Sequence, residues 1–387
     1  MRPASLCALL LIVLAGCSSS GGDLLDRVPP ALVTTNIEAD ATAVAVDTLV
    51  TVAVENGTLA EVTLLDAEGT PVGGEGSDTS WTAVERLEPG TAYSLTATAE
   101  GDDGEPMTIE RSFTSQDLTL DQQTYPSVAP LQGETVGVGM PVIVYFDLPV
   151  TDRATFEREM SVTAEPQQVG GWHWVSDTEV HYRPEVYWQP GSTVKVDLAL
   201  NSLPAGEGIY GQLDQEVEFQ VGRQVISTVD TAAHTMSVSI DGQVARTIPV
   251  TTGAPDKASR NGTKIIMEKF DAVDMDAAST GVDLTDPNYY NIPDVKWAMR
   301  LTNSGEFVHA APWSVASQGR ANVSSACVGM STENAGWLYQ NSQRGDVVVF
   351  TGSPRRLEPW NGWTDWNLDW SQWQAGSALA GEPAVAG

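Results

Sequence analysis

Apolar residues that alternate with polar or small ones recur along most of this chain, in short runs separated by turn signals. In "TLVTVAVENGTLAEVTLL", Val50, Val52 and Val54 alternate before Asn56-Gly57, and a second run follows. A period of two is typical of a strand with one buried face, and Asn-Gly is a strong signal for a hairpin turn. We therefore predict a hairpin here and a mainly β fold for the whole chain.

Two successive segments carry this strand pattern. "LEPGTAYSLTATAEGDDG" (87–104) and "WQPGSTVKVDLAL" (188–200) both place a Pro-Gly turn before an alternating strand. We predict immunoglobulin-like β-sandwich domains over residues 31–115 and 116–222. His173 and His181 lie among aromatic residues of the second domain, without acidic or cysteine ligands at matching spacing. We therefore expect them to fill space, and we expect no metal site.

The third segment, residues 223–351, combines strands with one helix. "HTMSVSIDGQVARTIPVTTG" predicts a hairpin around Asp241-Gly242, and Ser331 is the expected N-cap of a helix that Gly345 ends. Residues 347–350 then form a closing strand. The tail, residues 352–387, holds five of the chain's 12 tryptophans at spacings of three and four. They either share a helix face suited to stacking on sugars or pack back onto the β domains.

The N-terminus has the features of an export signal. "MRPASLCALLLIVLAGC" has a basic start, an apolar run too short to span a bilayer, and small residues directly before Cys17. This arrangement resembles the cleavage site of bacterial lipoproteins. It predicts a signal peptide over residues 1–16, a lipidated Cys17 and a tether over 17–30, which would anchor the protein at the outer face of the cytoplasmic membrane, within the cell wall. An ordinary signal peptide with an incidental cysteine is the alternative.

Charge and cysteine content narrow the partners and the chemistry. The net charge of −31 argues against nucleic acid or anionic lipid as a ligand. Cys7 leaves with the signal peptide and Cys17 is lipidated, so Cys327 is left alone and no intramolecular disulfide is possible. A single thiol in an exported protein is either buried and inert or a reactive nucleophile.

Cys327 has one plausible basic partner. A thiol becomes a nucleophile when a base takes its proton, and beyond residue 222 the only histidines are His234, in a hairpin, and His309. Elimination points to His309, eighteen positions before Cys327, with mostly small residues between them. Successive backbone amides around Ala326 and Cys327 can stabilise a developing oxyanion.

These residues resemble the active-site segment of the L,D-transpeptidases, the YkuD catalytic domain family, especially its actinobacterial type. "HAAPWS" and "SSAC" stand at the spacing of that family's base and nucleophile segments, and the likeness continues through "GEFVH", "STENAGWLYQNSQRGDVV" and "DWNLDWSQWQAG". The family implies two immunoglobulin-like domains, a β-rich catalytic domain with a short helix, and a Trp-rich tail. It also implies Cys327 as nucleophile, His309 as base, the Ala310 carbonyl as its support, and the amides of Ser325, Ala326 and Cys327 as the oxyanion site.

The resemblance further implies which residues contact the substrate. Tyr290 stands near the family's lid tyrosine, with the register uncertain by about one residue, and Trp313, Asn322 and Ser324 are expected to line the groove. Four positions depart from the family pattern. Ser325 replaces a histidine, Ala326 a glycine, Ala310 a serine, and Gly329 an asparagine or arginine. Because the main-chain groups survive these changes, we expect an altered but working site.

The implied reaction is acyl transfer between peptidoglycan stem peptides without a cofactor. The cysteine releases D-Ala from a tetrapeptide stem, and a neighbouring diaminopimelate amine resolves the thioester to give a 3→3 cross-link. Carbapenem-type β-lactams are the expected covalent inhibitors. Two alternatives stay open: an L,D-carboxypeptidase, in which water resolves the thioester, and a non-catalytic envelope lipoprotein that binds stem peptides in the same groove.

Overall fold

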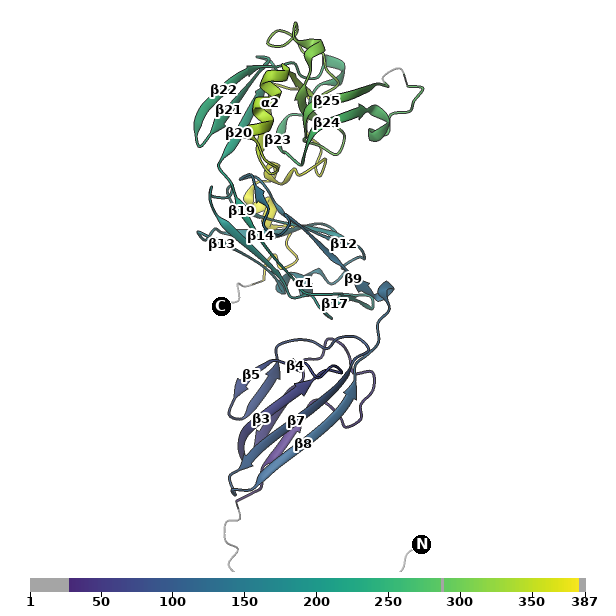
Figure 1. Ribbon diagram of the computed structural model, residues 1–387, viewed down its shortest axis with the longest axis vertical. Helices are drawn as coiled ribbons and strands as arrows, with labels where there is room; N and C mark the ends of the chain where they lie inside the picture. The colour runs from purple at the N-terminus through teal and green to yellow at the C-terminus, as the bar shows by residue number, and fades with distance from the viewer. Residues whose placement is uncertain (1–27, 287–288, 383–387) are drawn as a thin grey trace, which may run out of the picture. The chain divides into compact units, whose positions relative to one another are not determined.

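The computed structural model describes residues 28–286 and 289–382 (Figure 1). The predicted signal peptide, Cys17 and most of the tether lie outside these residues. Contacts between residues divide the chain into two compact units. Of the described residues, the first takes 28–41, 50–85 and 92–113, and the second takes 42–49, 86–91, 114–286 and 289–382. Strands dominate both units, which confirms the predicted mainly β fold.

The first unit is a β-sandwich of two four-stranded sheets, in the orders β1-β2-β6-β5 and β4-β3-β7-β8. Val52 and Val54 of one sheet and Leu95 and Ala97 of the other are buried, while the residues between them are more exposed. The alternation read from the sequence therefore builds this core. The strands are β1 (Leu32–Thr35), β2 (Thr51–Glu55), β3 (Gly57–Leu65), β4 (Pro71–Val72), β5 (Gly74–Ser77), β6 (Ser80–Ala83), β7 (Ala92–Gly101) and β8 (Pro106–Thr114).

The hairpin predicted at Asn56-Gly57 is wrong. β2 pairs with β1 and β6, whereas β3 pairs with β4 and β7, so this turn carries the chain from one sheet to the other. Asn56 has a φ of +57°, a conformation that asparagine tolerates. A Cβ on Gly57 would lie 2.4 Å from the carbonyl oxygen of Glu100, so glycine is required there. The turn signal is real, but the strands it joins are chosen by tertiary packing.

The second unit begins with another β-sandwich. Its sheets have the orders β10-β12-β15-β14 and β11-β19-β16-β13, beside a small sheet β17-β18-β9. Large aromatic side chains fill its interior, including Phe156, Trp172, Trp174, Trp188 and Phe219. The elements are η1 (Leu120–Gln122), β9 (Gln123–Thr124), β10 (Pro126–Ala129), β11 (Thr135–Val136), β12 (Val142–Phe146), α1 (Arg153–Arg158), β13 (Met160–Glu165), β14 (Gly170–Ser176), β15 (Glu179–Pro184), β16 (Thr193–Leu198), β17 (Pro204–Gly206), β18 (Ile209–Gly211) and β19 (Gln215–Val221).

Two further sheets, β22-β21-β20-β28-β23 and β24-β25-β26-β27, form the next part of this unit. Helix α2 packs against β25 and β26 (Figure 1). The elements are β20 (Val225–Asp230), β21 (Thr235–Ile240), β22 (Gln243–Pro249), η2 (Pro255–Lys257), β23 (Gly262–Ile265), β24 (Glu268–Asp276), η3 (Ala277–Thr280), β25 (Asn291–Arg300), β26 (Phe307–Ala310), η4 (Pro312–Ser314), β27 (Val328–Met330), α2 (Thr332–Asn341) and β28 (Val347–Thr351).

Local signals in this part were read correctly, apart from one helix end. β21 and β22 pair as an antiparallel hairpin around Asp241-Gly242, and the Ser331 hydroxyl accepts a hydrogen bond from the Asn334 amide at 3.2 Å as the N-cap of α2. The helix ends at Asn341, four residues before the predicted stop. Gly345, with a φ of +93°, instead forms the turn that leads into β28.

The tryptophans of the tail pack back onto the second sandwich and do not share one helix face. Within residues 352–382, the helical elements are η5 (Asp365–Asn367) and α3 (Trp370–Gln374). The guanidinium of Arg183 lies 4.6 Å from the ring centres of both Trp366 and Trp373. Asp365 accepts a hydrogen bond from Nδ1 of the buried His181 at 2.7 Å. Sandwich, catalytic sheets and tail thus share one folded unit.

Candidate active site

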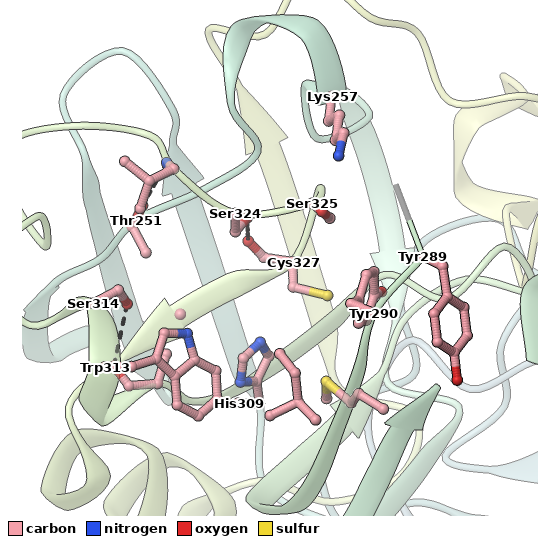
Figure 2. A pocket seen from close by; sticks show the side chains of 15 residues that line it. Thr251, Lys257, Tyr289, Tyr290, His309, Trp313, Ser314, Ser324, Ser325 and Cys327 are labelled. Atoms are coloured by element: carbon pink, nitrogen blue, oxygen red, sulfur yellow. Dashed lines mark hydrogen bonds between the residues drawn. The ribbon is translucent and has the colours of Figure 1, made fainter. Parts of the chain in front are cut away.

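Cys327 and His309 line the same cavity of about 340 Å³ (Figure 2). The predicted residues Tyr290, Trp313, Ser324 and Ser325 line it as well, so the structure brings most of the sequence-predicted site together. Sequence reasoning did not assign the other lining residues to the cavity, although several stand in or beside the quoted motifs. Ala311 and Ser314 belong to "HAAPWS", Tyr289 adjoins Tyr290, and Gly329 stands two residues after Cys327. The remaining lining residues are Thr251, Lys257, Met275, Ile292 and Val323.

Strand pairing explains how the cysteine and the histidine meet. β26 and β27 are parallel neighbours, with His309 opposite Gly329, and Cys327 immediately precedes β27. Val308 and Ala310 belong to the core around α2. Because side chains alternate along a strand, His309 then faces the cavity. The segment that connects the two strands, residues 311–327, consists mostly of small residues, as the sequence analysis noted.

The thiol of Cys327 is buried and protonated at rest. Its side chain donates a hydrogen bond from Sγ to the Gly305 carbonyl at 3.6 Å, and the residue is 5% exposed. Burial raises the pKa of the thiol to about 12, although the backbone N–H of Phe307 acts in the opposite direction. Among the described residues, no hydrogen bond joins Sγ to the imidazole of His309.

His309 is arranged as a neutral base. Its Nδ1 lies 2.8 Å from the carbonyl oxygen of Ala310, which fixes the proton on Nδ1 and leaves Nε2 as an acceptor. Burial lowers the pKa of the imidazole, and the hydrogen bond to Ala310 offsets this only in part. The ring stacks on Trp313 with centroids 5.9 Å apart. At neutral pH the imidazole is therefore uncharged and able to accept a proton.

The main chain before Cys327 is held in an unusual conformation. Ala326 has a φ of +74°, in the left-handed region, where a Cβ costs about 1–2 kcal/mol relative to glycine. Hydrogen bonds fix this loop: the Ser259 hydroxyl donates to the Ala326 carbonyl at 2.6 Å, and the Ser324 hydroxyl donates to the Cys327 carbonyl at 2.6 Å. The surrounding structure thus imposes on alanine a conformation suited to glycine.

Asn322 does not line the cavity, contrary to its predicted role. Its side-chain oxygen accepts from Nδ1 of His234 at 2.9 Å and from the Thr252 amide at 3.1 Å, and its Nδ2 donates to the Thr231 carbonyl at 2.8 Å. These bonds engage both ends of the amide group. Asn322 therefore ties the loop before the nucleophile to the neighbouring strands, and His234 belongs to this support.

The rim of the cavity carries aromatic and cationic groups. Tyr289 and Tyr290 both line it, so the uncertainty of one residue in the sequence prediction covers two real lining residues. Burial raises the pKa of Tyr290, and Trp313 is 57% exposed. Lys257 adds a cationic side chain to the rim on the side of Ser324 and Ser325 (Figure 2). Such a rim suits a peptide substrate with both apolar and anionic parts.

Gly329 explains one departure from the family pattern. A Cβ at this position would lie 2.9 Å from the Ala311 Cβ and 3.1 Å from Thr251 Cγ2. A larger residue therefore requires the neighbouring chain to move. The larger side chains of the family cannot be accommodated here without that shift.

A buried ionic cluster adjoins the segment that holds the thiol, because Glu306 directly follows Gly305, whose carbonyl accepts from Sγ. The ammonium of Lys264 pairs with Glu306, and Arg260 binds the other carboxylate oxygen of Glu306 at 3.0 Å. Arg260 also pairs with Glu358. Sequence reasoning missed this cluster: Glu306 lies in "GEFVH", but its partners Arg260 and Lys264 come from a distant segment, and nothing in the sequence pairs them with it.

The histidines of the second sandwich do not form a metal site. His181 binds Asp365 and Glu179, and His173 stacks on Trp373 with centroids 4.7 Å apart. Within residues 28–286 and 289–382, no group of three or more His, Cys, Asp or Glu side chains has the arrangement to hold a metal ion.

Comparisons with known proteins agree with this geometry. The L,D-transpeptidase catalytic domain family (YkuD) matches residues 224–350, and the bacterial Ig domain family matches residues 41–204. L,D-transpeptidase 2 of Mycobacterium tuberculosis is 36% identical over 94% of this chain and 88% of its own length. L,D-transpeptidase 5 of the same species is 35% identical over 96% and 84%.

A solved structure agrees as well. The structure of LD transpeptidase LdtMt1 in complex with imipenem is 34% identical, with a TM-score of 0.52 over 59% of this chain and 99% of that chain. The predicted fold class, immunoglobulin-like sandwiches followed by a YkuD domain, is thereby confirmed. The sequence similarity covers most of both chains, and the protein belongs to the L,D-transpeptidase family of acyltransferases, which use a cysteine nucleophile.

Proposed function

We propose that this protein forms 3→3 cross-links between peptidoglycan stem peptides, with Cys327 as nucleophile and His309 as base. One observation carries the assignment to these residues. A neutral, carbonyl-supported imidazole and the lone described thiol face one cavity of about 340 Å³. Membership of the family supports the type of reaction, and the geometry of the cavity supports the choice of Cys327 and His309 as the reacting residues.

The first half-reaction acylates the enzyme. Nε2 of His309 takes the proton of the Cys327 thiol as Sγ bonds to the carbonyl carbon of the third stem residue. The amide bond to the terminal D-Ala then breaks, and its nitrogen receives that proton from the imidazolium. Free D-Ala leaves, and a thioester on Cys327 remains.

The second half-reaction transfers the acyl group. The side-chain amine of a neighbouring diaminopimelate attacks the thioester carbon and loses a proton to His309. The carbon–sulfur bond breaks, and the thiolate recovers its proton from the imidazolium. The new amide is the 3→3 cross-link, and both residues return to their neutral forms.

Charge on the carbonyl oxygen needs support in both steps. The backbone amides of Ser325, Ala326 and Cys327 are the proposed donors, because they adjoin the nucleophile in a loop fixed by Ser259 and Ser324. Since these donors belong to the main chain, the replacement of the family histidine by Ser325 leaves them in place.

Carbapenem-type β-lactams are the proposed covalent inhibitors of Cys327. A relative of this chain has been solved in complex with imipenem, one such compound. The β-lactam carbonyl presents the same electrophile as a stem peptide, so Sγ opens the ring and forms a thioester. The acyl-enzyme then lacks a fitting amine acceptor.

The N-terminal segment suggests where the reaction takes place. We propose that Cys17 is lipidated after signal cleavage and anchors the protein at the outer face of the cytoplasmic membrane. Among the helices of the described residues, none is long and apolar enough to cross a membrane. Intact mass of the membrane-extracted protein tests this idea: acyl groups on Cys17 support it, and a secreted form that lacks Cys17 opposes it.

Product analysis separates the proposed reaction from its alternatives. The purified protein is incubated with a disaccharide-tetrapeptide, and the products are followed by mass spectrometry. A cross-linked dimer with release of D-Ala supports transpeptidation. A tripeptide monomer without dimer indicates an L,D-carboxypeptidase, and an unchanged substrate indicates a non-catalytic binding protein.

A further inference from the structure

The ionic cluster behind Cys327 is unusual in its burial. The Lys264 side chain is 0% exposed and the Glu306 side chain 2% exposed. Burying an ion pair gains little stability over an apolar pair of similar size, because both charges lose their hydration. A cluster of this kind beside a nucleophile therefore calls for a role beyond stability.

The cluster has a net positive charge where it is most deeply buried. Arg260 and Lys264 share the single carboxylate of Glu306, each bound to a different oxygen. Glu358 also pairs with Arg260, but its side chain is 50% exposed, so solvent screens its charge. The Lys264 ammonium lies 3.5 Å from the ring centre of Phe350 as well, which further stabilises a cation.

Geometry couples this cluster to the thiol. Sγ of Cys327 donates to the carbonyl of Gly305, the residue directly before Glu306. The N–H of Phe307, the residue directly after it, points to the same sulfur. Cys327 thus contacts both neighbours of Glu306, the residue that pairs with Lys264.

We propose that Lys264 is a positioning residue for the nucleophile: Glu306 holds its ammonium behind Cys327, where its charge stabilises the thiolate formed during attack. In a buried site a unit charge interacts with a neighbouring group far more strongly than in water. The proposal rests on Cys327 as the nucleophile of the proposed function. It adds a second source of activation besides His309.

Other titratable groups also face the thiol. His309, Tyr289, Tyr290 and Lys257 line the cavity side, and Arg260, Lys264 and Glu306 lie behind it. Burial raises the thiol pKa most, the charge of Glu306 raises it further, and the charge of Lys264 lowers it by less than Glu306 raises it. Burial lowers the pKa of Lys264 to about 8, so its amine is mostly protonated at pH 7.

The test measures the reactivity of the thiol alone. The purified full chain is alkylated with iodoacetamide between pH 6 and 10, and peptide mass spectrometry follows Cys327. Lys264→Met should lower the alkylation rate at pH 7 about tenfold, the effect of raising a thiol pKa by about one unit. Glu306→Gln should raise the rate, because it removes the negative charge.

The sign of the change separates electrostatics from structural damage. Both variants break the same ion pair, and a loosened pocket would expose the thiol and speed alkylation in both. Lys269→Met is the matched control: this partly buried lysine binds the carbonyls of Tyr339 and Ser342, on another part of the fold. Its loss should leave the Cys327 profile unchanged. An unchanged or faster rate in Lys264→Met would overturn the proposal.

Lys264→Arg keeps the proposal testable if Lys264→Met does not fold. A guanidinium stays charged at every pH used, whereas the lysine loses its proton above about pH 8. Lys264→Arg should match the unmodified protein at pH 7 and react faster at pH 9 and above. If Lys264→Arg reacted at the same rate as the unmodified protein at pH 9 as well as at pH 7, the proposal would be contradicted. The alkylation assay needs no peptidoglycan, so it tests the role of Lys264 independently of the proposed reaction. A negative alkylation result would not argue against transpeptidation, and a negative transpeptidation assay would not change the alkylation result.

Discussion

His309 on β26 and Cys327, which immediately precedes the parallel strand β27, face one cavity, yet the thiol donates its hydrogen bond to Gly305 and not to the imidazole. Burial favours the neutral form of both groups, since it raises the pKa of the thiol and lowers that of the imidazole. The resting site is therefore a thiol and a neutral base, and the nucleophile forms when a substrate carbonyl enters.

Acylation by a carbapenem should depend on both residues. Cys327→Ala should take up no carbapenem mass, and His309→Ala should slow acylation by about 10²–10⁴-fold, the usual contribution of a general base. Ser325→His should still be acylated. In the unmodified protein the rate should fall only below about pH 6.5, because the lowered pKa keeps His309 unprotonated to lower pH. Intact mass spectrometry of reactions quenched at successive times gives these rates. If His309→Ala were acylated as fast as the unmodified protein, His309 would have no role in the mechanism.

Replacement of Ala326 by glycine should stabilise the folded protein. Its φ of +74° is strained for alanine, so Ala326→Gly should raise the free energy of unfolding by up to about 1 kcal/mol. Ala326→Val should destabilise the fold and block acylation, because a β-branched residue fits this conformation worst. Thermal unfolding of the three proteins provides the comparison. A less stable Ala326→Gly protein would show that the loop is not strained.

The contact between His181 and Asp365 makes the fold sensitive to alkaline pH. Burial alone would lower the pKa of His181, but Asp365 and Glu179 outweigh it and raise the pKa to about 9. A raised folded-state pKa stabilises the fold fully below about pH 6.5, and that stability is lost as the pH rises through about 9. The melting temperature should therefore fall between pH 7 and 10, and it should fall less in His181→Gln. The same slope in both proteins would exclude this group as its source.

The first sandwich should be dispensable for the chemistry. All residues that line the cavity come from positions 251–329. Deleting residues 31–115 should leave carbapenem acylation of the purified protein nearly unchanged, while lowering the 3→3 cross-links made by the anchored protein in cells. Deleting residues 116–222 should abolish folding, because Ile265, Val347 and Trp363 share a core with the second sandwich. If the first deletion abolished acylation, that domain would have to contribute to the active site.

Sequence reasoning located the reacting groups because they lie close together in the chain. His309, Ser324 and Cys327 fall within one short segment whose spacing carries the family resemblance. Lys264 and Glu306 are 42 residues apart, and His181 and Asp365 are 184 apart, so only the folded chain brings them together. Asn322 lies in the right segment, but its side chain satisfies backbone groups on the far side of the loop.

Direct detection of the acyl-enzyme tests the central claim. The purified protein is mixed with a disaccharide-tetrapeptide, quenched in acid and analysed by intact mass and peptide mapping. The account predicts a mass gain equal to the substrate less D-Ala, located on Cys327 early in the reaction, which disappears as the substrate is converted to cross-linked dimer. A dimer formed by the Cys327→Ala protein, or by the unmodified protein without any adduct on Cys327, would contradict it.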